Sequence, residues 1–338
     1  MKLIKTTEAV GHVLCHDLTQ IIPEEYKGAR FKKGHVVTEA DIPVLLSMGK
    51  ENLYIFELDK EMLHENDAAA VLCRICQGEN VSRSDVHEGK IELSAAIDGC
   101  FVLDTERLNR INSVDEIMIA ARKGFTGVKA GDKLAGTRVI PLVIDRKKLE
   151  EAEAIMSDDP IMRVQPYVLK KAAIVTTGSE VFHGRIEDKF TPVLIDKLKE
   201  YGIEVIRHLT TDDGIENVMK AINEAHEGAD IVLCTGGMSV DPDDNTPGAI
   251  RASGAEIVTY GAPVLPGAMF LLGYNNDGVP VLGLPGCVMY AKATVFDLVM
   301  PRIAAGIRLT KQDFVNFGEG GLCLGCKPCT YPHCPFGK

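Results

Sequence analysis

The pattern of apolar and polar positions changes character halfway along the chain. From Lys171 onward, short β-branched runs alternate with segments in which apolar residues recur every three or four positions. Strands that alternate with helices in this way are typical of a mostly parallel sheet with helices on both faces. The pattern therefore predicts an α/β domain over residues 170–308.

The elements expected in this domain follow one another closely. Strands are predicted at 172–176, 203–209, 231–234 and 279–284, with room for two more within 255–273, and helices at 190–201, 214–227, 246–252 and 287–305. The carboxyl ends of parallel strands lie at one edge of a sheet. The turns that follow these strands are therefore expected to meet there.

The preceding residues 1–165 are expected to form a mixed α+β region. Helices are predicted at 38–48, 59–77, 113–120 and 146–156, and strands at 53–56, 90–96, 100–103 and 138–144. The helix at 113–120 is inferred from a capping-box pattern at its start. Cys73 and Cys76 lie on the second helix, where we expect them in the core. Residues 309–338 have no periodic apolar pattern and are treated as a separate Cys-rich tail.

Composition limits the partners and the compartment. A formal net charge of −11 argues against nucleic acid or an anionic membrane as the main partner. No apolar run approaches the roughly 20 residues that span a bilayer, and Met1–Val10 lacks the apolar core of a signal peptide. We therefore expect a cytoplasmic protein whose cysteines stay reduced.

The candidate chemistry lies in four turns that follow predicted strands: Thr176–Val181, Thr210–Gly214, Thr235–Ser239 and Leu284–Cys287. The last turn is expected to open the helix at 287–305 and to present free amides. Hydroxyls and glycine amides in such turns bind phosphate or other oxyanions. Carboxylate oxygens are the ligands that Mg²⁺ prefers, and the candidates for this role are Glu180, Asp212, Asp213 and Asp244.

The third turn belongs to the most informative stretch, Ala229–Pro247. A buried strand runs into Gly236-Gly237, and three carboxylates, Asp241, Asp243 and Asp244, precede a helix start for which Thr246 is the expected N-cap. This order suggests a ligand site. The alternative is an ordinary βα loop with solvated acids.

Lys171–Gly306 resembles the molybdopterin-binding domain shared by molybdopterin molybdotransferases and molybdopterin adenylyltransferases. Thr177–Val181 lies where the molybdotransferases have T-G-D-E-L, Gly236–Val240 followed by Asp244 matches G-G-x-S-x-G-x-x-D except at Asp241, and Leu284–Gly286 matches the start of L-P-G-N-P. The resemblance covers about 40% of the chain. Residues 34–56 resemble the flanking domains of the same family only weakly.

The resemblance implies insertion of molybdate into adenylylated molybdopterin with release of AMP, assisted by Mg²⁺. It places Glu180 and Asp244 near the metal or molybdate, and Asp212 and Asp213 beside the pocket. The residues that it implies for binding are Thr177, Gly178, Ser179, Asp213, Gly236, Gly237, Ser239, Pro285 and Gly286. Ser239 is expected to donate a hydrogen bond. Family members are commonly homo-oligomers.

The chain departs from the family at several motif positions. Pro285-Gly-Cys-Val288 replaces P-G-N-P, Pro266-Gly-Ala-Met269 lacks the lysine of P-G-K-P, and Asp188-Lys-Phe190 replaces D-T-N. Loss of a lysine weakens binding of a highly charged adenylate or of molybdate. A non-catalytic molybdopterin carrier or sensor that serves a molybdoenzyme is therefore the alternative function, and a nucleotide-pyrophosphate hydrolase is a third.

The tail carries a second signal. Cys323, Cys326, Cys329 and Cys334 follow a spacing close to the C-x2-C-x2-C-x3-C-P run of bacterial iron–sulfur proteins, with one extra residue. Four thiolates also close a tetrahedral Zn²⁺ site. We therefore expect an iron–sulfur cluster or Zn²⁺ here, and a reduced docking peptide is the alternative.

Overall fold

The computed structural model describes residues 2–22, 26–55, 61–239 and 244–338. The chain divides into two compact units. Unit 1 contains residues 1–97, 102–124 and 130–164, and unit 2 contains 98–101, 125–129 and 165–338. No helix in the described ranges is long and apolar enough to cross a membrane.

The first part of unit 1 is built from short elements. β1 (Lys2–Lys5) pairs with β4 (Asn52–Ile55), β2 (Leu18–Ile22) pairs with β3 (Tyr26–Phe31), and the chain also forms η1 (Thr6–Glu8) and α1 (Asp41–Ser47). A small core joins them through Leu14, Phe31, Leu45 and Leu53. This arrangement confirms the helix-then-strand order expected for residues 38–56, of which Phe56 lies outside the described residues.

The second part of unit 1 is a four-stranded sheet with helices. The sheet order is β6 (Val81–Arg83), β7 (Ile91–Ala95), β11 (Lys133–Val139) and β9 (Ile117–Ala121); β5 (Met62–His64) pairs with β12 (Val143–Asp145), and the helices are α2 (Glu65–Cys76), α3 (Thr105–Asn112) and α4 (Arg146–Met156). Cys73 and Cys76 are fully buried on α2, as predicted.

Two helix predictions in this unit are wrong. The segment predicted at 59–77, of which residues 59 and 60 lie outside the described residues, is not one helix, because β5 ends at His64, whose side chain accepts from the amide of Asn66 and caps α2. The segment 113–120 contains β9, in which Ile117 and Ile119 are buried while Met118 and Ala120 are exposed. This two-residue period outweighs the capping-box pattern, and the helix lies earlier, where Asp104 caps α3.

Unit 2 contains the predicted α/β domain. Its six-stranded sheet has the order β15 (Glu204–Thr211), β14 (Lys171–Thr177), β16 (Ile231–Thr235), β19 (Pro280–Leu284), β18 (Leu271–Tyr274) and β17 (Glu256–Tyr260). The first four strands are parallel, and β18 and β17 complete the sheet in antiparallel pairing. The mostly parallel sheet is therefore confirmed.

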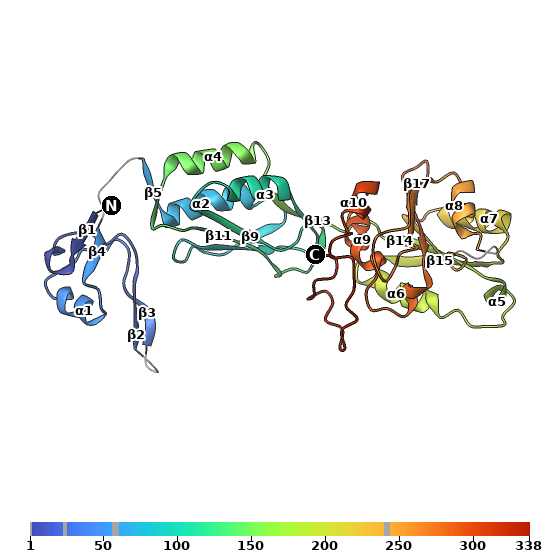
Figure 1. Cartoon of the computed structure of the whole chain (residues 1–338), viewed down its shortest axis with the longest axis horizontal. Helices are drawn as coiled ribbons and strands as arrows, with labels where there is room; N and C mark the ends of the chain where they lie inside the picture. Colours follow the sequence, from blue (N-terminus) through green and yellow to red (C-terminus); the bar gives the residue numbers. More distant parts are fainter. Residues whose placement is uncertain (1, 23–25, 56–60, 240–243) are drawn as a thin grey trace. The chain divides into compact units, whose positions relative to one another are not determined.

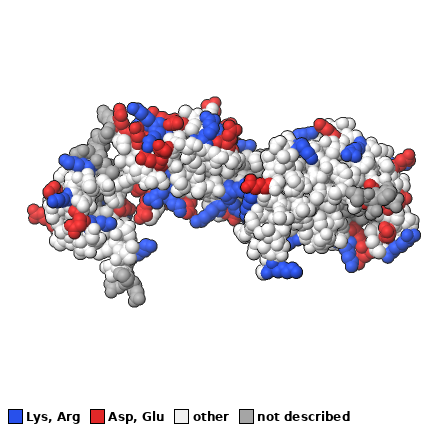
Figure 2. Space-filling model, in the orientation of Figure 1, with Lys and Arg blue, Asp and Glu red and all other residues white. Residues whose placement is uncertain are grey.

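Helices cover both faces of this sheet (Figure 1). On one face, α7 (Ile215–His226) and α8 (Thr246–Ala252) pack on Val175 and Val232. On the other, α6 (Phe190–Lys199) and α9 (Val295–Ala304) pack on Ile174 and Leu233. Neighbouring strand residues thus enter different cores, as the alternation of a strand requires. Most of the face of unit 2 in Figure 2 carries neither acidic nor basic side chains.

The long helix predicted at 287–305 is shorter than expected. Gly286–Met289 form the 3₁₀ turn η2, and α9 begins only at Val295. Thr294 and Asp297 form a capping box at this point, which fixes the true helix start. The turn after β19 therefore does not open a long helix.

The remaining elements of unit 2 are short. They are α5 (Ser179–Phe182), α10 (Lys311–Val315) and β10 (Thr126–Val128), which pairs with Gly99–Phe101 of β8 (Gly99–Leu103), while β13 (Met162–Pro166) leads into the unit. The tail folds back onto the domain. Leu322 bridges to Leu265, Gly337 donates to the carbonyl of Gly320 (2.8 Å), and Phe336 enters the core on the α9 face.

The buried Phe336 predicts that the tail stabilises unit 2. Phe336→Ala should lower the free energy of unfolding by about 3 kcal/mol, because it removes a core ring at the end of the closed tail. Val315→Ala, at a half-exposed position, should change it by less than about 0.5 kcal/mol. Urea unfolding, combined with hydrogen exchange of residues 320–338, measures both. Equal effects of the two changes would refute the anchoring role.

Candidate functional site

The strand register brings the predicted turns of unit 2 to one edge. Thr177 at the end of β14 lies beside Thr211 of β15, Thr176 lies beside Thr235 of β16, and Thr235 lies beside Leu284 of β19. The turns that follow these strands therefore leave the sheet together, which is the position where open α/β sheets bind ligands.

At this edge the turns after β14 and β16 approach each other very closely. A Cβ atom on Gly236 would lie 2.2 Å from the carbonyl oxygen of Thr177, and one on Gly237 would lie 2.8 Å from Thr246 Oγ1. Both glycines have positive φ, +83° and +54°. Only glycine fits Gly236, because the clash there is with backbone.

Side chains then tie the turns together. Thr246 Oγ1 donates to the carbonyl of Gly236 (2.9 Å) and lies 3.2 Å from Thr177 Oγ1. The N–H and hydroxyl of Ser179 both donate to Asp213 Oδ2, at 2.9 and 3.0 Å. Asn245 Nδ2 donates to the carbonyl of Asp213 (2.9 Å). The turns after β14, β15 and β16 therefore form one hydrogen-bonded unit.

Two of the predicted acids already have structural roles. Asp213 accepts both bonds from Ser179. Asp212 Oδ1 accepts from Asn217 Nδ2 (2.7 Å) and from the amide of Gly214 (3.3 Å) at the start of α7. These hydrogen bonds, that from Asn217 first, hold the pKa of Asp212 below its usual value.

Of the other predicted acids, Glu180 is exposed in α5 and Asp244 is half-buried before α8. Asp241 and Asp243 lie outside the described residues. In the part of the chain that the structure describes, no three His, Cys, Asp or Glu side chains are grouped so that they could hold a metal ion. Mg²⁺ is commonly held by one or two carboxylates together with substrate phosphates, so its binding at Glu180 or Asp244 stays a prediction.

The remaining predicted residues border the edge in different ways. Gly178 is the N-cap of α5 with φ +133°, and Ser239 is exposed after the glycine pair. Pro285 is buried, whereas a Cβ on Gly286 would meet no atom within 4 Å. The expected helix N-terminus at Gly286 is replaced by η2. The Thr246 prediction also needs correction, because the N-cap of α8 is Asn245.

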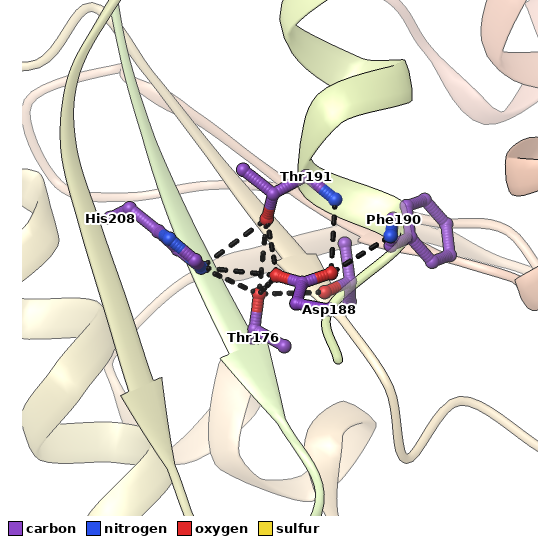
Figure 3. Close-up of polar contacts among 6 residues, drawn as sticks. Thr176, Asp188, Phe190, Thr191 and His208 are labelled. Atoms are coloured by element: carbon purple, nitrogen blue, oxygen red, sulfur yellow. Dashed lines mark hydrogen bonds and ion pairs between the residues drawn. The ribbon is translucent and has the colours of Figure 1, made fainter. Parts of the chain in front are cut away.

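A second polar network, which the sequence did not reveal, lies on the opposite face of β14 (Figure 3). Asp188 Oδ2 accepts from Thr191 Oγ1 (2.6 Å) and Thr176 Oγ1 (3.0 Å), and its Oδ1 accepts from the amides of Phe190 and Thr191 at the start of α6. His208 Nε2 lies 2.9 Å from Thr176 Oγ1 and 3.3 Å from Asp188 Oδ2.

The donors in this network determine the tautomer of His208. Thr176 and Thr191 each give their single hydroxyl proton to Asp188, so neither has a proton left for the imidazole. His208 Nε2 therefore carries a proton and donates to Thr176 Oγ1.

Burial raises the pKa of Asp188, but the hydrogen bonds from Thr191, Phe190 and Thr176 outweigh it and hold the pKa below its usual value. Sequence analysis noted Asp188 only as the first residue of an altered motif and did not single out His208. Asp188 precedes α6 and His208 lies on β15, and the two meet beside Thr176 of β14.

The cysteines occupy contrasting environments. Cys323 and Cys334 are half-buried at the base of the tail, and Cys326 and Cys329 are exposed. Cys234 is fully buried, and burial raises the pKa of its thiol to about 12. Cys234 is therefore a packing residue.

The sheet order, the doubly covered core and the tied turns define an α/β ligand-binding domain. A family model described as "Probable molybdopterin binding domain" matches residues 173–305. This segment of the chain therefore belongs to the molybdopterin-binding domain family. A domain of unknown function (DUF8806) matches residues 3–57.

Similar curated proteins share only part of their length with this chain. A CinA-like protein of Pseudothermotoga lettingae is 36% identical over 85 residues, which are 25% of this chain and 21% of the relative. A molybdopterin molybdenumtransferase of Staphylococcus aureus is 30% identical over 121 residues, 34% of this chain and 29% of the relative. The matched stretch thus spans less than a third of either relative.

Solved structures of low sequence identity also align with the chain. The CinA protein of Thermoplasma acidophilum is 18% identical and covers 40% of this chain and 98% of its own, with a TM-score of 0.35. The molybdopterin biosynthesis moea protein of Pyrococcus horikosii is 16% identical and covers 72% of this chain and 80% of its own, with a TM-score of 0.34.

The Asp188 network predicts a stability difference that depends on pH. The pKa of Asp188 is lower in the folded than in the unfolded chain, so its stabilising contribution is present above about pH 4 and is lost as the pH falls through the folded pKa. Asp188→Asn should destabilise unit 2 by about 2 kcal/mol at pH 7, and this difference from the native chain should shrink toward pH 2.

Urea unfolding at several pH values measures this effect. Asp196→Asn is the control, because Asp196 is exposed and its ion pair in the described part of the chain is with Lys199. A difference between Asp188→Asn and the native chain that stays constant from pH 7 to acid would contradict the assigned hydrogen bonds.

Proposed function

We propose that the tied turns of unit 2 bind molybdopterin or adenylylated molybdopterin. The observation that carries the proposal is the close crossing of Gly236 over Thr177, held by Thr246, in a domain of the molybdopterin-binding family. This crossing fixes glycine turns and hydroxyls at the carboxyl edge of the sheet. A rigid set of donors at this edge binds an anionic ligand with little loss of entropy.

The donors have separate roles in this proposal. The amides of Gly178, Gly236 and Gly237 face the phosphate or adenylate, and the exposed Ser239 donates a further hydrogen bond. Ser179 and Asp213 hold their turns in place through each other.

The reaction proposed for this site is insertion of molybdate into adenylylated molybdopterin with release of AMP, as the family resemblance implies. The alternative is a binding protein that delivers the cofactor to a molybdoenzyme. A specific observation favours this alternative: Asp212 and Asp213 both accept hydrogen bonds from the protein, and no three His, Cys, Asp or Glu side chains of the described residues are grouped to hold a cation. Tight binding can therefore occur without turnover.

The binding proposal is tested by a change at the crossing point. Gly236→Ala should weaken molybdopterin binding at least tenfold, because its Cβ forces the two turns apart. Gly228→Ala is the matched control: its φ is +77°, but a Cβ there meets no atom within 4 Å. It should lower stability by about 1 kcal/mol and leave binding unchanged. Equal binding by the two variants would refute the proposal.

Analysis of the reaction products distinguishes the three candidate functions: molybdotransferase, cofactor carrier and nucleotide-pyrophosphate hydrolase. The chain is incubated with adenylylated molybdopterin, molybdate and Mg²⁺ beside an active control enzyme. Release of AMP that Gly236→Ala abolishes supports the molybdotransferase. Tight binding without AMP supports the carrier, and hydrolysis of ADP-ribose supports the nucleotide-pyrophosphate hydrolase.

We also propose a metal at the tail cysteines, either an iron–sulfur cluster or Zn²⁺. Cys323, Cys326, Cys329 and Cys334 all lie inside the loop that the Gly337–Gly320 hydrogen bond closes, and a closed loop rich in thiols is suited to ordering by a metal. The four thiols are not grouped as ligands in the structure, so binding requires the exposed Cys326 and Cys329 to move toward the base of the loop.

Metal analysis tests this second proposal. Protein purified without oxygen should contain iron with sulfide, or zinc, in a fixed ratio to the chain, and Cys326→Ser should lose most of it. Cys234→Ser is the control, because Cys234 is buried in the sheet away from the tail. Equal metal content in the native chain and in Cys326→Ser would end the hypothesis.

A further inference from the structure

Unit 1 contains a cavity that the proposed function does not use. It has a volume of about 490 Å³, and residues from the start of β2, the start of α2, the turn before β7 and the end of β11 line it. This volume is in the range of pockets that bind small organic molecules, and it is much larger than a single ion needs.

Two cations line the cavity without an ion-pair partner among the described residues: Lys50, which is half-buried, and Arg138, which is exposed. Two carboxylates of the wall accept hydrogen bonds from neutral groups of the protein. Asp17 accepts from the amide of Lys33 (2.7 Å), and Glu88 accepts from Thr19 (3.5 Å). These neutral donors leave both carboxylates charged, so the wall carries anions as well as cations, and Lys50 and Arg138 are its groups that suit an anionic part of a ligand.

The wall also offers acceptors that the described part of the protein does not satisfy. His16 Nδ1 is buried and has no hydrogen-bond partner among the described residues. Glu65, only 8% exposed, lies in the same wall, and its carboxylate forms no hydrogen bond with a described residue. Burial raises the pKa of Glu65, and the charge of Arg138 opposes this effect. A buried polar atom without a partner is rare and calls for an explanation.

The rest of the wall is apolar or aromatic. Tyr54 lines the cavity with a ring that is 40% exposed, and the ring of His16 lies 6.4 Å from it, centroid to centroid. Ile140 and Val86, both exposed, add apolar surface. A flat ring fits such a wall, because aromatic faces stack on planar groups.

We propose that this cavity binds a phosphorylated nitrogen heterocycle, of the nucleotide or pterin-phosphate type. The phosphate contacts Lys50 and Arg138, N–H groups of the ring donate to Glu65 and His16, and the ring lies against Tyr54. Each part of the ligand has a complementary group in the wall. The phosphate meets the two cations, the N–H groups meet the unsatisfied acceptors, and the heterocycle meets the exposed ring of Tyr54. The proposal does not depend on the function of unit 2.

Titration calorimetry tests the proposal with five probes: AMP, GMP, neopterin monophosphate, adenosine and inorganic phosphate. The full-length Gly236→Ala chain is used, so that binding at the sheet edge of unit 2 is weakened. At least one of the three phosphorylated heterocycles should bind at least tenfold more tightly than adenosine and phosphate. Whether a nucleotide or the pterin binds best identifies the source of the ligand.

Two variants on this background assign the two ends of the ligand. Arg138→Gln should weaken binding of the best probe at least tenfold and leave adenosine unchanged. Glu65→Gln should weaken the best probe severalfold and leave inorganic phosphate unchanged. Arg74→Gln is the matched control, because Arg74 is an exposed arginine of unit 1 outside the cavity.

Three outcomes would overturn the proposal. The first is no binding of any phosphorylated heterocycle at millimolar concentration. The second is equal affinity for the best probe in the Arg138→Gln and Arg74→Gln chains. The third is a loss of affinity in Glu65→Gln that is the same for inorganic phosphate as for the heterocycle.

Discussion

The carboxyl edge of unit 2 depends on one steric constraint, the passage of Gly236 over the carbonyl of Thr177. With 2.2 Å available for a Cβ atom, the backbone of two turns occupies the space that a side chain needs. This contact allows Thr246 to reach the carbonyl of Gly236 and Asn245 to reach the turn after β15. The donors of three turns are therefore held in one arrangement before a ligand binds, which is the condition for tight binding of a small anion.

Two neighbouring residues of β14 belong to different hydrogen-bond networks, one on each face of the sheet. Thr177 faces α8 and joins the crossing turns, whereas Thr176 faces α6 and joins Asp188 and His208. The alternation of a strand makes this division unavoidable. A change in the register of β14 would therefore disrupt both networks, and the parallel partners on both sides of β14 oppose such a change.

Local sequence patterns made the α/β half predictable. The other features could not be predicted, because they depend on contacts between residues that are distant in sequence. The strands at 172–176 and 231–234 follow from apolar runs, and the convergence of their turns follows from parallel order. The start of α9 was missed because Thr294 and Asp297, rather than Pro285 and Gly286, supply the cap. Asp188 and His208 meet because the residues before α6 lie beside Thr176 of β14, next to β15, and the cavity of unit 1 needs segments far apart in sequence. No local pattern reports such contacts.

The acids of the edge show that residues predicted to bind a cation can instead hold the turns of the protein. Carboxylates in a row suggest a cation site in a sequence, but Asp212 holds the start of α7 and Asp213 holds the turn of Ser179. A carboxylate that accepts hydrogen bonds from its own protein has fewer lone pairs for a cation, and moving it to a cation would release the turn that it holds. With a formal net charge of −11 over the whole chain, attraction of an anionic ligand must come from amides and hydroxyls close to it. At this edge the two aspartates therefore first hold the turns of the binding surface in place.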